Sequence, residues 1–555
     1  MRKILRFILW VFVVVAATGL SFVLYASIAW RTTPPHAFTL NGPNPTAEII
    51  GTNTYTCGNS WMRKNQYGIW EMYLEGSPIE IGAKRGALSH NLIELQEGYF
   101  IDQIKQIIPS EFYLRFLKYF IAWFNRDLEK NIPEEYLREM YGLSLYAPDK
   151  FSYIGNNYER ILHYHSAHDI GHAMQDYMLV GCTSFASWGK YTPDSSLTVG
   201  RNFDFYVGDD FAKDKIVCFI KPDKGYQFAM ITWAAMVGVS SGINEKGLTV
   251  TINAAKSKPP TASATPISIL AREILQYAGT IEEARAIASK RKIFVSESLL
   301  IASAADGRAA IIEKSPHQSG FFQPDRDFVV CANHFQSKVF ETDPLNLENI
   351  EESSSMSRYQ RMTELIETLA PISPRKAAVI LRDRMGPGGS NIGMGNEKSI
   401  NQFIAHHSII FKPEQKQFWL ATKPWQMGPY ICYNMDSIFS ESNQLNIEHE
   451  IIQPGKTIEK DPFLQSEAFK NYLKFRVMKK IIKSADKPVD LPVNNFQDFI
   501  KLNPEYFLTY QLVGDYYMKQ YIYDSASFYY KKALNKCISN KWEREMIEKN
   551  LNKCQ

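Results

Sequence analysis

Residues 179–190 read LVGCTSFASWGK, and this stretch decides how the rest of the chain is interpreted. An apolar run ends at Gly181 and Cys182, and small hydroxyl residues and an aromatic residue follow. Residues 90–180, ahead of this step, have mostly helical periodicity. After it come short runs typical of strands, separated by turn residues. The Gly-Cys step therefore lies where the pattern changes from helices to strands.

Cys182 is predicted to be an internal residue that becomes a new N-terminus. A thiol attacks only as a thiolate and needs a base or a lowered pKa. An N-terminal cysteine carries its own base, an α-amine with an unperturbed pKa of about 8. In this hypothesis the Cys182 sulfur attacks the Gly181 carbonyl, an ester forms, and water releases the amine. Gly181 suits this step because it has no side chain to block the bent geometry.

Four motifs follow one another in order along the chain: GCTSFASW, GRNFDF, GINEKGLTVTINAA and ANHF. In this order they resemble the acyl-coenzyme A:6-aminopenicillanate acyltransferase branch of the N-terminal-nucleophile hydrolases. Bile-salt hydrolases, penicillin V acylases and the acid ceramidase group look like more distant relatives. The likeness covers residues 68–425. It implies an α+β fold, a four-layer αββα sandwich, and acyl transfer from an amide through a thioester.

The resemblance also implies roles for individual residues. Cys182 would be the nucleophile and, through its amine, its own base. Asp204 would hold that amine, and Arg201 would lie beside the sulfur, where its charge favours thiolate. Asn253 and Asn333 would supply oxyanion-hole donors, which stabilise charge that appears only in the tetrahedral state.

Two of these residue assignments are not settled by the motifs alone. Arg201 and Asp204 stand three residues apart, which on a strand puts them on opposite faces, so the chain must bend near Phe203. The family's distal arginine is assigned to Arg358 in SSSMSRYQR, with Arg361 as a rival. ATKPW near residue 423 also lacks a glycine expected before the proline, which puts the rim of the substrate pocket in question.

Each site residue also has an interpretation without catalysis. Cys182 could be core packing, as most buried cysteines are. Arg201 and Asp204 could form a simple ion pair, and Asn253 could cap a turn. The four motifs in one order favour a single active site over these separate explanations.

The N-terminus carries an apolar run over residues 7–30 with no charged residue. This run exceeds the roughly 20 residues that a helix needs to cross a bilayer. Arg2, Lys3 and Arg6 precede it, which predicts a cytoplasmic N-terminus and an extracytoplasmic catalytic domain on a single-pass anchor. The alternative is a cleaved signal peptide, with Ser27 and Ala29 near the cut.

The chain divides into five predicted regions. Residues 1–30 form the anchor, and the proline-rich residues 31–66 form a stalk. Residues 67–181 belong to the catalytic domain and stay bound as an α-subunit after cleavage. Residues 182–450 form the catalytic core, and residues 451–555 are helical.

The C-terminal region has a repeat-like spacing of small and aromatic residues. The residues concerned are Gly514, Tyr517, Ala526, Tyr530 and Ala533. They match one tetratricopeptide helix pair, and a generic helical hairpin is the alternative. Because about three repeats are usually needed to stand alone, the segment is expected to pack on the main domain, with a protein partner as a further expectation.

Composition excludes several classes of function. A net charge of +4 over 555 residues, without a basic run, argues against nucleic acid. No cysteine pair has CxxC spacing, so neither a metal cluster nor a disulfide framework is expected, and one isolated disulfide is left open. No cofactor is expected, and no coenzyme A site is readable. The 7 cysteines are Cys57, Cys182, Cys218, Cys331, Cys432, Cys537 and Cys554.

A histidine cluster, HYHSAHDIGH, stands just ahead of the cleavage site. It holds His163, His165, His168, Asp169 and His172, and the HDIG part looks like the core of metal-dependent HD phosphohydrolases. Those enzymes need a further histidine well upstream, which the sequence does not offer in the right context. The favoured interpretation is a polar helix whose His168 and Asp169 are paired or assist self-cleavage.

The sequence therefore predicts an exported amide hydrolase or acyltransferase acting on linear amides such as N-acyl amino acids or lipid-like amides. Hydrolysis and transfer to an amine are both left open. A catalytically inactive, membrane-anchored interaction protein is the alternative from another class.

Overall fold

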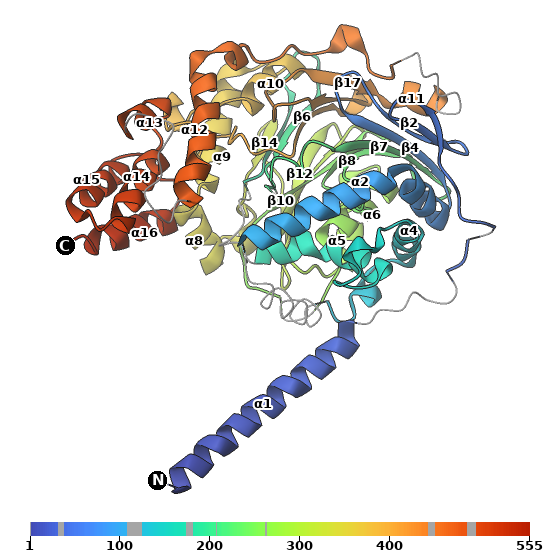
Figure 1. Cartoon of the computed structure of the whole chain (residues 1–555). Helices are drawn as coiled ribbons and strands as arrows, with labels where there is room; N and C mark the ends of the chain where they lie inside the picture. Colours follow the sequence, from blue (N-terminus) through green and yellow to red (C-terminus); the bar gives the residue numbers. More distant parts are fainter. Residues whose placement is uncertain are drawn as a thin grey trace.

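The computed structural model describes nearly the whole chain. The described residues are 2–30, 38–40, 42–107, 125–173, 181–206, 208–260, 263–441, 450–484 and 496–555. Two β-sheets packed face to face form the body of the molecule (Figure 1).

The larger sheet has 11 strands in the order β1-β2-β3-β4-β7-β8-β9-β10-β11-β12-β13. β4 and β7 run parallel, and the other neighbouring strands of this sheet pair antiparallel. The chain ahead of Cys182 supplies β1 to β4, so it is part of the sheet. The strands are β1 (Glu48–Gly51), β2 (Thr54–Cys57), β3 (Ser60–Lys64), β4 (Trp70–Gly76), β7 (Ile216–Pro222), β8 (Phe228–Thr232), β9 (Ser241–Asn244), β10 (Leu248–Ala254), β11 (Glu297–Ser303), β12 (Arg308–Lys314) and β13 (Ser319–Phe322).

The smaller sheet has six strands in the order β14-β5-β6-β15-β16-β17, all antiparallel. Its β5 starts directly after Cys182, as the change of pattern at that residue indicates. The strands are β5 (Thr183–Gly189), β6 (Ser195–Phe203), β14 (Phe328–Cys331), β15 (His407–Lys412), β16 (Gln417–Ala421) and β17 (Tyr430–Asn434).

Alternation along β7 shows how one strand serves two cores. Val217 and Phe219 point between the sheets, whereas Ile216, Cys218 and Ile220 point to the helices outside the larger sheet. A strand covered on both faces reads as a continuous apolar run, because neither face meets water.

Helices cover the outer face of each sheet. Residues of α2, α4, α5, α6 and α7 share one core with the larger sheet, and residues of α9 and α10 share another with the smaller sheet. The layers are therefore helix, sheet, sheet and helix, which confirms the αββα prediction. These helices are α2 (Pro78–Ile107), α4 (Glu134–Ser144), α5 (Asn157–Ala173), α6 (Ile267–Tyr277), α7 (Ile281–Lys290), α9 (Ser355–Leu369) and α10 (Pro374–Leu381).

The stalk prediction for residues 31–66 is wrong for its second half. Residues 48–64 form β1, β2 and β3, and Trp61 and Met62 in β3 are buried on opposite faces of the sheet. Thr52, Asn53 and Asn59 lie in the two turns between these short strands, where such residues are common, and Thr54 and Thr56 lie in β2.

The N-terminal helix α1 (Arg2–Trp30) stands apart from the body in Figure 1. Its stretch Ile4–Tyr25 has a mean hydropathy of 2.6 and is 0% buried. By length and composition it matches a membrane span, and a signal sequence near the N-terminus would have the same features.

The C-terminal helices gather beside α8 (Pro344–Glu352) and α9 at one side of the body (Figure 1). They form a core of their own, which also takes in Phe403 and Met427 from the body. Within the α14–α15 pair, Tyr530 packs so closely on Gly514 that a Cβ there would lie 2.7 Å from its ring. The tetratricopeptide assignment stays a prediction. The helices are α12 (Glu467–Ser484), α13 (Phe496–Leu502), α14 (Phe507–Lys519), α15 (Tyr523–Leu534) and α16 (Lys541–Asn552); α11 (Met435–Glu441) follows β17.

The C-terminal region is bonded to the loop that runs from residue 391 to residue 403. Asn503 accepts from the backbone N–H of Met394 at 3.1 Å and donates to its carbonyl at 2.8 Å. Asn396 donates to the carbonyl of Cys537 at 2.8 Å and accepts from Ser539 at 3.2 Å. These bonds fix the loop against the C-terminal region.

Candidate active site

Strands β5 and β6 bring the first two motifs together. Thr183 pairs with Asn202 and Ser184 with Arg201, so the residues that follow Cys182 lie against the RNFD motif. β6 ends at Phe203, and Asp204 lies just beyond it. The strand therefore ends where the sequence required a bend.

The Cys182 sulfur lies 3.6 Å from Nη2 of Arg201, and both side chains are buried. Arg201 also donates to the carbonyls of Ser240, at 2.8 Å, and Ile252, and to the hydroxyl of Ser241. Burial raises the pKa of the Cys182 thiol to about 11, although the charge of Arg201 lowers it. In the uncleaved chain the thiol is therefore protonated at neutral pH and needs a base.

Asp204 is fully buried, with one carboxylate oxygen engaged and one left over. Its Oδ2 lies 3.4 Å from the amide nitrogen of Gln402, and its backbone carbonyl accepts from Gly181 at 3.1 Å. Oδ1 has no hydrogen-bond partner among the described residues. Burial raises the pKa of Asp204 to about 7, against the opposing charges of Arg358 and Arg201.

The Gly181 carbonyl, at the expected cleavage point, accepts two hydrogen bonds. Nη1 of Arg358 donates to it at 2.7 Å and Nε2 of Gln402 at 2.9 Å. A Cβ at residue 181 would lie 2.3 Å from that Gln402 nitrogen, so a larger residue would displace Gln402 from this carbonyl. The two donors would stabilise negative charge on this oxygen if sulfur attacked the carbonyl carbon.

Asn253 and Asn333 lie at the same site. Asn253 accepts from Ser184 at 3.0 Å and donates to the carbonyl of Cys331 at 3.1 Å. Asn333 donates to the carbonyl of Ala254 at 2.8 Å and accepts from Nη2 of Arg358 at 2.9 Å. Each amide nitrogen carries a second N–H beyond the one used in these contacts.

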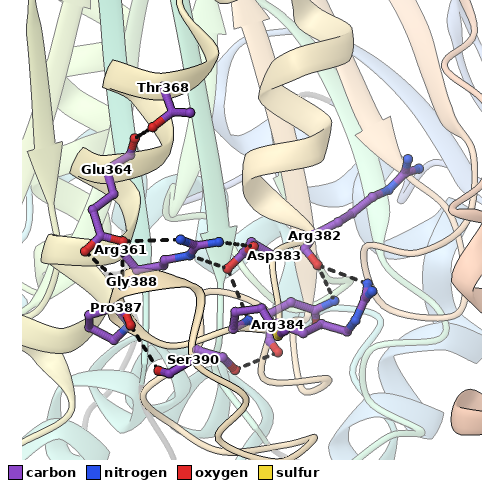
Figure 2. Close-up of polar contacts among 12 residues, drawn as sticks. Arg361, Glu364, Thr368, Arg382, Asp383, Arg384, Pro387, Gly388 and Ser390 are labelled. Atoms are coloured by element: carbon purple, nitrogen blue, oxygen red, sulfur yellow. Dashed lines mark hydrogen bonds and ion pairs between the residues drawn. The ribbon is translucent and has the colours of Figure 1, made fainter.

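Arg358, not Arg361, reaches Cys182. Arg358 is 1% exposed and also donates to the carbonyl of Cys182 at 2.8 Å. Arg361 points away and forms two 3.0 Å bonds with Asp383 and one of 3.2 Å with Glu364, as Figure 2 shows. The rival assignment to Arg361 is therefore excluded by its position in a separate ion-pair cluster.

Gln402 is the residue that the sequence did not point to. It stands in INQFIAHH, outside the four motifs, and bonds to both the Gly181 carbonyl and Asp204. A single buried glutamine has no local signature, because only the packing of distant segments places it at a site.

Two histidines of the cluster, His163 and His165, have described side chains, and both make contacts within the fold. His165 accepts from the backbone N–H of Val237 at 2.8 Å, and its other ring nitrogen lies 2.7 Å from the Ile161 carbonyl. His163 contacts Asn125 at 2.7 Å. The side chains of His168, Asp169 and His172 lie outside the described residues.

The same described part of the chain holds no cluster of three or more His, Cys, Asp or Glu residues that could bind a metal. All 7 cysteines are free, so the isolated disulfide left open by the sequence is not present.

Replacing Asp204 should stabilise the uncleaved protein in a pH-dependent way. Because the folded-state pKa of about 7 exceeds the ordinary value of about 3.9, stability falls as pH rises from about 4 to about 7 and is constant above. In a Cys182→Ala background, Asp204→Asn should therefore raise the free energy of unfolding at pH 8 by up to about 4 kcal/mol. At pH 4 the two proteins should unfold alike. Urea titrations at both pH values measure this, and an equal difference at both would contradict it.

Comparison with known proteins agrees with the resemblance seen in the motifs. Residues 191–423 match the family described as acyl-coenzyme A:6-aminopenicillanic acid acyl-transferase. This confirms the resemblance over that range, which begins after Cys182 and ends before the C-terminal helices. An uncharacterized protein of Archaeoglobus fulgidus is 24% identical over 401 residues, and the alignment covers 64% of this chain and 65% of that relative.

Three solved structures also align with the chain. The N-acylethanolamine-hydrolyzing acid amidase ortholog of Caenorhabditis elegans is 15% identical, with a TM-score of 0.31, over 42% of this chain and 93% of its own. A mutant conjugated bile acid hydrolase of Clostridium perfringens is 12% identical, with a TM-score of 0.35, over 50% and 97%. Penicillin V acylase of Agrobacterium tumefaciens is 16% identical, with a TM-score of 0.30, over 46% and 86%.

Proposed function

We propose that this relative of the acyl-transferase family cleaves itself between Gly181 and Cys182 and then acts on linear acyl amides through a thioester on Cys182. The observation that carries the proposal is the pair of donors on the Gly181 carbonyl, Arg358 and Gln402, beside a buried sulfur. The two donors act on the carbonyl of one peptide bond, Gly181–Cys182, and the packing of the fold does not by itself require donors at that oxygen.

The self-cleavage would proceed in two steps. Asp204, with its free Oδ1, takes the proton of the Cys182 thiol, and the sulfur forms a bond to the Gly181 carbonyl carbon. The bond to the Cys182 nitrogen then breaks, that nitrogen receives the proton, and a thioester remains. Water hydrolyses the thioester, which leaves a carboxylate on Gly181 and a free thiol and amine on Cys182.

The mature site would use the new amine as its base. The amine takes the thiol proton, the thiolate attacks the amide carbonyl of the substrate, and the proton passes to the departing amine. Asp204 offers the amine a buried carboxylate oxygen, and Arg201 favours the thiolate. Asn253 and Asn333 each have an N–H to offer the tetrahedral intermediate. Water or an amine then takes the acyl group.

The alternatives have less support. An HD-type phosphohydrolase would need a further histidine upstream of HDIG as a metal ligand; of the candidates, His165 has both ring nitrogens engaged, and a ring nitrogen of His90 lies 2.8 Å from the Tyr146 carbonyl. A buried carboxylate with one unpaired oxygen, such as Asp204, costs folding free energy. A protein without catalytic activity would have no use for it. Helix α1 is proposed as a single-pass anchor with the catalytic domain outside the cytoplasm, and the C-terminal helices as a surface for a protein partner.

Intact-mass measurement of the purified protein tests the proposal. We expect two chains that stay associated, one ending at Gly181 and one running from Cys182 to Gln555. Incubation with a panel of N-acyl amino acids should then release the free acid. A protein that remains one chain after expression and prolonged incubation would count against the proposal.

A further inference from the structure

A small cavity lies next to the aromatic cluster that packs on Cys182. Cys182 packs in one cluster with Phe203, Phe205 and Phe211, and Phe100 and Trp233 pack against that cluster. The cavity has a volume of about 40 Å³, room for about three waters or for the end of a chain. Its lining is mainly aromatic and consists of Gln96, Glu97, Phe100, Tyr164, Phe205, Phe211, Trp233 and Ala235.

Both sides of the cleavage point build this cavity. Glu97 and Phe100 come from α2 and Tyr164 from α5, ahead of Cys182, whereas Phe211 and Trp233 follow it. The segment ahead of the cut must therefore stay in place for the cavity to exist.

Glu97 is the charged residue of the lining, and it is 4% exposed. Its Oε1 accepts from Nε of Arg160 at 2.7 Å and from the hydroxyl of Tyr164. Its Oε2 is buried and has no hydrogen-bond partner among the described residues. Gln96, the neighbouring polar residue, uses its oxygen and one of its N–H groups, since it bonds to the carbonyl of Asp214 and the N–H of Ala234, both at 2.7 Å.

Arg160 cannot turn to satisfy the second oxygen. Its Nη1 donates to the carbonyl of Gly155 at 3.1 Å and to Asn157 at 3.0 Å, and its Nη2 donates to the carbonyl of Pro148 at 2.6 Å. Because Arg160 already balances the charge of Glu97, an added ammonium would bring an unpaired charge into the cavity. A neutral donor, such as a hydroxyl or an N–H, fits the free oxygen.

We propose that this cavity binds the far end of the acyl group and that Oε2 of Glu97 recognises a hydroxyl or N–H at that end. The proposal rests on the proposed function, because it assigns the acyl group to the Cys182 thioester. The acyl group stays attached to the sulfur while the amine leaves, so a cavity that shares Phe205 and Phe211 with the cluster around Cys182 suits the far end of the acyl group. The preferred substrates are then amides of ω-hydroxy or similar acids, not of plain alkyl acids.

Binding of product acids tests this without turnover. The probes are two acids of equal length, one ending in a hydroxyl and one in a methyl ketone, which accepts hydrogen bonds but does not donate them. Isothermal titration calorimetry on the full-length protein, over a series of chain lengths, should show the hydroxy acid binding at least about tenfold more tightly at the best length. Equal affinities, or binding of ω-hydroxy amines in preference to the acids, would overturn the proposal.

Glu97→Gln should invert this preference. Arg160 would hold the amide oxygen of the new residue and turn its NH₂ toward the cavity, so the ketone acid should bind at least as tightly as the hydroxy acid. Glu94→Gln is the matched control, because Glu94 is on the same helix but pairs with Lys150 at the surface, and it should keep the wild-type ratio. General damage to the protein would lower both affinities and would not invert them.

Ala235→Leu keeps the proposal testable if Glu97→Gln does not fold. The added side chain fills the cavity, so the ratio of the two affinities should fall to about one. A ratio unchanged by this variant would place the recognition elsewhere. Failure of the proposed function would appear differently, as an uncleaved chain or as no turnover of any amide, while the ratio of acid affinities still reports on Glu97.

Discussion

Cys182→Ala should give a protein that remains a single chain of 555 residues and hydrolyses no amide. The substitution removes the atom that attacks the Gly181 carbonyl and, with it, both the cut and the new amine. The methyl group of alanine cannot replace the sulfur as a nucleophile. Denaturing gels and intact mass show the cut, and release of free acid from an N-acyl amino acid shows turnover.

Cys218→Ala is the matched control. The Cys218 thiol is buried, has a pKa raised to about 11 by desolvation, and lies 3.7 Å from Nη2 of Arg85. It thus shares with Cys182 the burial and the neighbouring guanidinium, but it follows no glycine carbonyl held by two donors. This variant should be cut and should turn over substrate as the wild type does. Cleavage at residue 181 in the Cys182→Ala protein would exclude the sulfur as the attacking atom.

Arg358→Ala should slow self-cleavage by about 10²–10³-fold. Arg358 supplies the shorter of the two hydrogen bonds to the Gly181 carbonyl, and this oxygen becomes negatively charged as the sulfur attacks. Gln402 would remain as the second donor, so cleavage should be slow and not absent. The measurement is the rate at which the two fragments appear after synthesis in a cell-free system.

Arg361→Gln controls for the loss of an ion-paired, partly buried arginine on the same helix. Arg361 holds Asp383 and Glu364, as Figure 2 shows, whereas Arg358 and Gln402 donate to the Gly181 carbonyl. Its replacement should lower the melting temperature but leave the cleavage rate of the folded protein within about threefold. If both variants slow cleavage equally and melt equally early, the effect of Arg358 is one of folding and the oxyanion role is wrong.

The four-layer arrangement was implied by the resemblance, whereas local patterns indicate only the strands and helices within it. Such patterns are short-range, as in the continuous apolar run of β7, the Thr280–Glu283 capping box of α7 and the Ser373 cap of α10. The strands in residues 48–64 were missed because β1 and β2 have four residues each, too short for a clear alternation.

The site could be predicted only where its residues sit in motifs. Arg201 and Asp204 are three positions apart, and their closeness to Cys182 follows from one pairing of β5 with β6. Gln402 lies 221 residues from Gly181 along the chain, so only the folded molecule brings it to the carbonyl. Glu97 stands in a helix with no sign that one of its oxygens would be left without a partner.

The bonds between the C-terminal helices and the loop at residues 391–403 bear on when the chain can mature. That loop ends beside Gln402, and its Glu397 carbonyl accepts from Nε of Arg358 at 3.1 Å. Asn503, Cys537 and Ser539 hold the loop, and they lie 109, 141 and 143 residues beyond their partners in it. Because a chain is made from its N-terminus, these braces are synthesised after Arg358 and Gln402, so the pair of donors proposed to promote the cut would be fixed in place only once the C-terminal helices have been made.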